Sequence, residues 1–328
     1  MRLRICSALL SVPLAMGCAT APRGPAGDLA QAGIKATGAL SSDVGDLSRR
    51  LEYADVTDAF TRTWTNCSPT APTCNPQLAP DENYSARRDL AKVIRLRARA
   101  LDALSAAYSA LNQEAQYDAR ADLSGAADAA VSGVNAFASG VARLSGAAPG
   151  AAAISEPLGG VLSFGAGLLA ERNQRKRIIV ASRVIGAATK RMRDALQLEA
   201  QVFEESIAEV ENERTDARRA LLSADLISAS DLLKPMADQL SVKFVPNADA
   251  LLAKSPRARA AVIAAMKAMS RAEVLTIQNR YRSSIAAMDA LLAAHADLER
   301  GGPVSLADVE RTVSDLDAAL DRHLNKGG

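Results

Sequence analysis

Cysteine and histidine are the residue types of this chain best suited to chemistry, and both are scarce. The chain has four cysteines, of which Cys67 and Cys74 are spaced C-x6-C with two prolines between them. No histidine lies nearby to complete a zinc ligand set, so this spacing favours a disulfide formed in an oxidising compartment. We expect the Cys67–Cys74 bond to pin a connection between two helices, because so short a loop gains little from closure entropy alone.

The two histidines belong to no catalytic or metal-binding pattern. His295 continues an apolar stripe at helical spacing, which predicts a buried structural role, and His323 falls in the last turn of the final predicted helix, where a cation complements the helix dipole. The chain lacks the paired Glu-x-x-His motifs of a di-iron bundle. The glycine-rich run at 159–167 lacks the Lys-Ser/Thr of a phosphate loop. We therefore expect no catalytic residue, no metal and no cofactor, and a chain that is not an enzyme.

The first 18 residues carry an export pattern. Arg2 and Arg4 precede an uncharged apolar run that ends at Met16, too short for a membrane-spanning helix of roughly 20 residues. The segment Leu14-Ala15-Met16-Gly17-Cys18 resembles the lipobox of bacterial lipoproteins, with Gly17 and Cys18 in the matching positions. The resemblance implies that residues 1–17 are a signal peptide and that Cys18 carries the lipid, including palmitate. Because Ala19 follows the cysteine, it also implies an outer-membrane anchor with the body facing the periplasm.

A second cleavage pattern leaves another location open. Ala19-Thr20-Ala21 is an A-x-A site, and cleavage there would release a soluble periplasmic or secreted protein.

Composition predicts a helical body without a nucleic-acid surface. The 328 residues are 48 % apolar but only 3 % aromatic, and alanine is abundant, a composition typical of long helices packed through small side chains. The chain has 39 basic and 37 acidic residues, and loss of residues 1–17 would remove Arg2 and Arg4 and so balance the two. A balanced body gives no reason to expect nucleic acid as a partner.

Apolar residues repeat at three- and four-residue spacing along most of the body. We expect an all-α fold, an elongated antiparallel bundle of long helices in a single domain over 28–328, after a tether at 18–27. The final helix has a capping box, with Ser305 three residues before Asp308. The predicted helices span 28–64, 84–146 with breaks at glycines, 158–225, 228–240, 248–299 and 305–324.

The order of charges predicts a register. If the chain turns back near Pro149, facing residue numbers add up to roughly 299. The basic segment 172–193 then lies opposite acidic residues in 106–127, and the acidic segment 194–216 opposite basic residues in 83–105. Such exposed pairs contribute only ~0–1 kcal/mol each, so they would select the register more than stabilise the fold.

A hairpin tip at about 129–170 is the strongest functional lead in the sequence. Only Arg143 and Glu156 are charged between Ala129 and Ala170, and glycines on both arms would let two helices approach closely. A basic collar at 172–177 follows. The candidate membrane or partner contacts are Val134, Phe137, Val141, Leu144, Leu158, Val161, Leu162, Leu168, Leu169, Arg172, Arg175, Lys176 and Arg177. The alternative is that the hairpin is buried as core.

These patterns lead to one main expectation and two alternatives. The main expectation is a non-enzymatic lipoprotein of the periplasm and outer membrane, a structural or protein-binding helical module with an envelope protein as partner. The first alternative is a membrane-active protein that acts through the hairpin 129–177, a layout similar to that of α-helical pore-forming toxins. The second is a carrier of an apolar ligand held between the helices.

Overall fold

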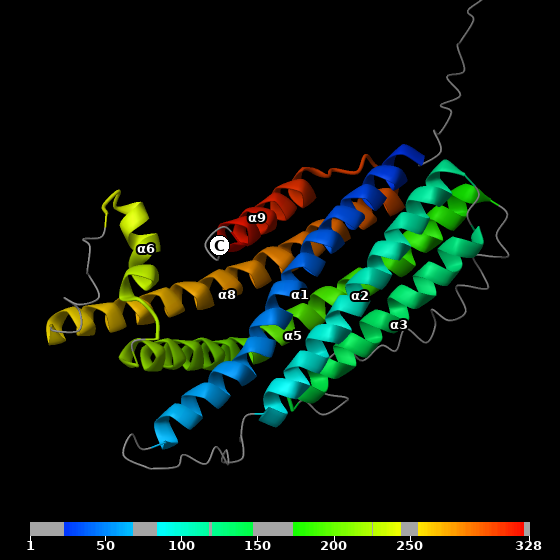
Figure 1. Cartoon of the computed structure of the whole chain (residues 1–328). Helices are drawn as coiled ribbons and strands as arrows, with labels where there is room; N and C mark the ends of the chain where they lie inside the picture. The colour runs from blue at the N-terminus through cyan, green and yellow to red at the C-terminus, as the bar shows by residue number, and fades with distance from the viewer. Residues whose placement is uncertain are drawn as a thin grey trace, which may run out of the picture.

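The computed structural model describes residues 23–67, 84–117, 120–146, 173–224, 226–243 and 255–324. Within these ranges the chain is helical and has no strand, which confirms the predicted all-α bundle (Figure 1). The helices are α1 (Arg23–Asn66), α2 (Tyr84–Gln116), α3 (Arg120–Leu144), α5 (Gln174–Ser223), α6 (Ala229–Gln239), α8 (Pro256–Arg300) and α9 (Ala307–Leu324). The predicted signal peptide 1–17, Cys18 and Cys74 lie outside the described residues, so the lipid and the disulfide stay predictions.

Long antiparallel helices form the body of the molecule. Helices α1, α5 and α8 have 44, 50 and 45 residues, and at 1.5 Å per residue α1 alone is about 66 Å long. Figure 1 shows α1 running down beside α2, which returns in the opposite direction. Ion pairs report this antiparallel order, since Arg87 meets Asp55 near one end of the pair and Arg97 meets Asp43 further along.

Capping residues mark the helix ends that the structure describes in detail. The side chain of Asn173 accepts hydrogen bonds from the backbone N–H groups of Arg175 and Lys176 at the start of α5. Ser255 does the same for Ala258 at the start of α8, where Pro256 is the first helical residue. Gly301 ends α8 with a φ of 74°, a left-handed conformation that glycine adopts without a steric penalty.

The sequence interpretation was wrong about the stretch 84–146. We expected one broken helical run, but it forms α2 and α3, which pack against each other. A Cβ on Gly133 would lie 3.3 Å from the Cα of Ala100, so the α2 and α3 backbones approach closely there. Gly133 and Gly140 therefore allow close approach of α3 to α2, the packing role that small residues predict, and neither breaks the helix.

The predicted register between α2 and α5 is nevertheless confirmed. Arg87 pairs with Glu213, Arg97 with Glu199, and Tyr108 with Thr189. Glu114 pairs with Arg177, so partner numbers add up to between 291 and 300 along the whole contact. The charge order selects this register even though α3 lies between α2 and α5 in the chain.

The bundle is closed at one end and open at the other. Near the start of α1, α9 packs against α1 and α8. At the far end, Figure 1 shows the last turns of α1, the end of α5 and the beginning of α8 diverging, with α6 beside α8. A small satellite core there contains Ala229, Val262 and Met266, separate from the main core. We call the half of the molecule containing the end of α1, the end of α5, α6 and the beginning of α8 the distal half.

Candidate functional site

A chain of charged side chains runs through the centre of the bundle. Arg97 on α2 is fully buried, as is Arg280 on α8. Asp43 on α1 joins them, with its carboxylate oxygens 2.9 Å from a nitrogen of Arg97 and 2.8 Å from Nε of Arg280. Glu199 on α5 lies 3.3 Å from the other side of the Arg97 guanidinium. Four helices thus meet at four charges that solvent does not reach.

The chain of charges continues along α1 toward the distal half. Asp46 lies 2.8 Å from Arg280 and 3.0 Å from Arg50. Arg50 is also buried, and its guanidinium reaches Glu211 at 2.8 Å and Glu273 at 3.2 Å. We call the residues Asp43, Asp46, Arg50, Arg97, Glu199, Glu211, Glu273 and Arg280 the ionic core.

Burial makes the ionic core sensitive to the loss of an arginine, because carboxylates would then remain in the interior without their cation. Moving a charge out of water costs several kcal/mol, and the remaining partners must offset that cost. Burial raises the pKa of Glu199 to about 7, although the nearby Arg97 opposes the shift. The hydroxyl of Tyr281 packs beside this group, and burial together with the Glu199 charge raises the Tyr281 pKa well above its usual value.

Sequence reasoning missed the ionic core because we assigned charged residues on long helices to solvated faces. A signal was present at Asp43 and Arg97, which each lie at a core position of an apolar stripe. Asp43 falls three residues after Leu40 and four before Leu47, and Arg97 bears the same relation to Ile94 and Leu101. A charge at such a position predicts a buried ion pair as soon as a second helix supplies the opposite charge.

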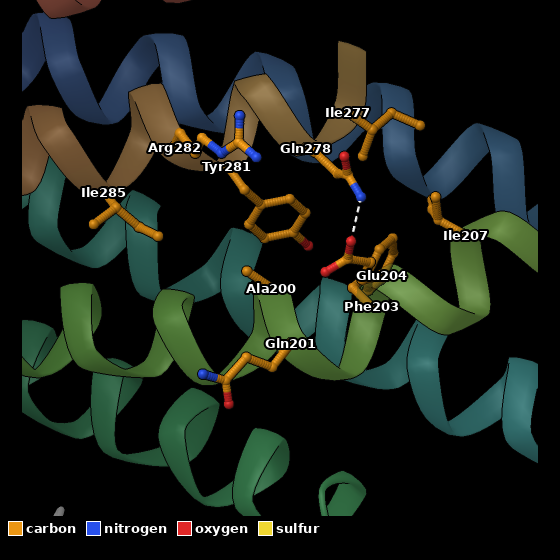
Figure 2. Close-up of a pocket in the computed structure, with 10 residues that line it drawn as sticks. All are labelled: Ala200, Gln201, Phe203, Glu204, Ile207, Ile277, Gln278, Tyr281, Arg282 and Ile285. Carbon is orange, nitrogen blue, oxygen red and sulfur yellow. Dashed lines mark hydrogen bonds between the residues drawn. The ribbon is translucent and has the colours of Figure 1, made fainter. Parts of the chain in front are cut away.

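A small cavity lies between α5 and α8 beside the ionic core (Figure 2). Its volume is about 140 Å³, and its walls include Phe203, Ile207, Ile277 and Ile285, with Tyr281 between them. The polar side chains at its edge include Glu204, Gln278 and Arg282, and Figure 2 marks the hydrogen bond that Gln278 donates to Glu204. A cavity of this size and polarity can hold one small apolar group, because engineered apolar cavities of about 150 Å³ bind benzene.

His295 lies in a buried polar cluster that resembles a catalytic arrangement only in its residue types. Its Nδ1 is 2.8 Å from the Ser182 hydroxyl and its Nε2 is 3.0 Å from the Tyr108 hydroxyl, which also bonds Thr189 at 2.9 Å. All four side chains are buried, and none lines a described cavity. Burial lowers the pKa of His295 to about 3, so the ring stays neutral. Burial of His295 confirms that it is a core residue, as its place in the apolar stripe predicts.

The described arm of the predicted hairpin tip is core. Val134, Phe137 and Val141 are fully buried in α3, and Leu144 is half-buried. Burial was the alternative that the sequence left open, and it means that these side chains form no contact surface in this structure. Leu158, Val161, Leu162, Leu168, Leu169 and Arg172 lie outside the described residues.

The described residues of the basic collar differ in their exposure to solvent. Arg177 is buried, and two of its nitrogens lie 2.9 and 2.7 Å from Glu114, so it belongs to the α2–α5 contact. Arg175 and Lys176 are exposed. In the described ranges, no helix is long and apolar enough to cross a membrane, and no cluster of three or more potential ligands could hold a metal ion.

Exposed large apolar side chains gather on the distal half. They come from the second half of α1, from α6 and its flanks, and from the first half of α8. The set is Tyr53, Val56, Trp64, Leu226, Met236, Leu240, Val242 and Leu275. Among the described residues, Tyr117 is the one exposed large apolar side chain outside this half. This enrichment makes the distal half the candidate contact surface of the described residues.

Fold and site together define an all-α bundle with a buried ionic core and with exposed apolar side chains on its distal half. Comparison with protein-family models, with curated proteins and with solved structures finds no match.

Proposed function

We propose that this chain is a non-enzymatic lipoprotein of the cell envelope. In this proposal, acyl chains on Cys18 hold it to the outer membrane, and the distal half binds a second envelope protein. The observation that carries the proposal is the course of α1, which begins at Arg23 and ends in the distal half.

The length of α1 separates the proposed anchor from the distal half. Cys18 lies five residues before α1, a tether of at most about 17 Å. From there α1 extends about 66 Å, so the exposed apolar side chains lie at the end remote from the anchor. A surface held away from its own membrane is better placed to meet a protein than to meet the lipid that anchors it.

The charges on α8 indicate which kind of protein surface would bind there. The first half of α8 carries the exposed basic residues Arg257, Arg259, Lys267 and Arg271, against a single carboxylate, Glu273, which the ionic core already holds. Apolar side chains among positive charges favour a partner surface that is itself apolar at its centre and acidic at its rim.

Site-specific photo-crosslinking in the living envelope tests this proposal. A photoreactive residue at Val56 or at Leu275 should capture the same envelope protein, whereas Tyr117, equally exposed at the other end, should capture none. Reversal of charge at Lys267 and Arg271 should abolish the adduct. Adducts at Tyr117 of equal yield, or adducts with lipid alone, would refute the proposal.

The membrane-active alternative gains no support from the described residues. It requires the arm 129–144 as a surface, and that arm packs its apolar side chains on α2.

A further inference from the structure

A second cavity lies between α1 and α5 in the distal half. Its volume of about 500 Å³ is within the ~300–1,000 Å³ range of small-molecule sites, unlike the cavity beside the ionic core. Part of its wall is apolar, with Tyr53 from α1 and Ala217 and Leu221 from α5. The cavity is therefore large enough for a ligand with an apolar body.

Four arginines dominate the polar part of the wall, which also includes Thr57 and one carboxylate, Asp46, that the ionic core already holds. The arginines are Arg49 and Arg50 on α1 and Arg214 and Arg218 on α5. The ionic core neutralises Arg50, which contacts three carboxylates. Arg214 lies 2.9 Å from Glu211, and Arg49 lies 3.8 Å from Asp46. These neighbours supply three carboxylates for four guanidinium groups, so the cavity has an excess of positive charge.

Arg218 carries that excess. No ion pair joins its half-buried side chain to a carboxylate among the described residues. Burial lowers the pKa of Arg218, and the Arg214 and Arg50 charges act in the same direction, against the carboxylates Glu211 and Glu273. A guanidinium that is partly withdrawn from water without a counter-ion favours binding of an anion, because the anion supplies the missing charge-assisted hydrogen bonds.

We propose that the cavity between α1 and α5 binds a small amphiphilic anion, with Arg218 holding its carboxylate or phosphate group and with Tyr53 and Leu221 covering its apolar tail. A purely inorganic anion would leave the apolar wall unused, and an uncharged lipid would leave Arg218 uncompensated. The site does not depend on the protein partner proposed above, since its lining comes from this chain alone.

Isothermal titration calorimetry of the mature chain tests the proposal, with Cys18→Ser present to prevent acylation. The buffer contains no detergent, and each probe stays below its critical micelle concentration. Dodecanoate, dodecyl phosphate, dodecanol and inorganic phosphate are the probes. We expect saturable one-to-one binding of dodecanoate or dodecyl phosphate, and the tighter of the two identifies the head group. Dodecanol and inorganic phosphate should bind at least tenfold more weakly.

Two neighbouring arginines provide the matched variants. Arg218→Gln should weaken binding of the preferred anion by tenfold or more. Arg219→Gln should leave it unchanged, because that side chain is exposed and pairs with Asp216 at 3.2 Å. Thermal unfolding of both variants checks that they fold, and Arg218→Gln should not lower the melting temperature, since it removes a charge that its neighbours repel. Equal binding of dodecanol and dodecanoate, or wild-type affinity in Arg218→Gln, would overturn the assignment.

Discussion

Arg97 shows how a single buried charge can connect its own helix to three others. Its guanidinium on α2 meets Asp43 on α1 and Glu199 on α5, and its face lies 5.1 Å from the ring centre of Tyr281 on α8. Each of these contacts is directional, so a shift of one helix along another would separate opposite charges in a dry interior. The ionic core therefore contributes to the choice of one helix register as well as to stability.

Removal of the Arg97 charge should be costly. In Arg97→Met, Asp43 would retain only Arg280 and Glu199 would lose its cation, so we expect the free energy of unfolding to fall by about 3–5 kcal/mol. Arg99→Met, on the exposed face of the same helix, should change it by less than about 0.5 kcal/mol. Urea unfolding followed by circular dichroism measures both. Equal effects at the two positions would contradict a special role for the ionic core.

Glu199 should make stability depend on pH. Burial raises its folded-state pKa to about 7, above the usual 4.5, so the folded protein binds a proton there that the unfolded chain has released. The stability contributed by this group is therefore present at low pH and declines as pH rises from about 4.5 to about 7. Glu199→Gln should remove that decline. We expect the variant and the wild type to differ little at pH 4.5, and the variant to be more stable by on the order of 1–3 kcal/mol at pH 8.

Denaturant midpoints at the two pH values measure this difference. The opposite result would be a wild type that becomes more stable than Glu199→Gln as pH rises from 4.5 to 8. It would show that the Arg97 charge outweighs burial and that the pKa of Glu199 is lowered by folding.

At the level of helices, close packing around Tyr108 depends on Gly33 of α1, which has no side chain. A Cβ on Gly33 of α1 would lie 2.3 Å from ring atoms of Tyr108, far inside van der Waals contact. Gly33→Ala must therefore displace the ring and strain its hydrogen bonds to Thr189 and His295, and we expect a loss of about 1–3 kcal/mol in stability.

The same helix offers two controls for this prediction. Gly38 and Gly45 are exposed, and a Cβ added at either one would meet no other atom within 4 Å, so alanine there should stabilise α1 by roughly 0.5–1 kcal/mol. Thermal unfolding of the three variants gives the comparison. A Gly33→Ala protein as stable as Gly38→Ala would mean that the Tyr108 contact is loose.

The elements show what sequence patterns can and cannot predict. Helix positions and the α2–α5 register follow from periodicity and charge order, which are local or pairwise properties. The reversal between Gln116 and Arg120 was missed, because no proline or glycine pair marks it and the apolar stripe resumes immediately afterwards. The ionic core was missed for a related reason. A charge in one stripe becomes favourable only when three other helices bring its partners, and that is a property of the tertiary fold.

At the scale of the whole molecule, the proposed separation of a membrane anchor from a binding surface depends on Cys18. The lipobox resemblance predicts that Cys18 becomes the acylated first residue, and about 45 Å of helix separates the start of α1 from Tyr53, the first of its exposed apolar side chains. Without acylation, α1 would no longer hold the distal half at a defined distance from a membrane, and partner binding would lose that geometric restriction.

Metabolic labelling with palmitate followed by membrane fractionation tests this prediction. Wild-type chain and Cys67→Ser should both incorporate label and sediment with the outer membrane, because Cys67 lies after α1 and outside the lipobox. Cys18→Ser should take up no label and should leave the membrane fraction. An unlabelled, soluble wild-type chain whose first residue is Pro22 would instead establish cleavage after Ala21. The distal half would then meet the proposed partner by free diffusion, and tighter binding would be needed to compensate for the lost local concentration.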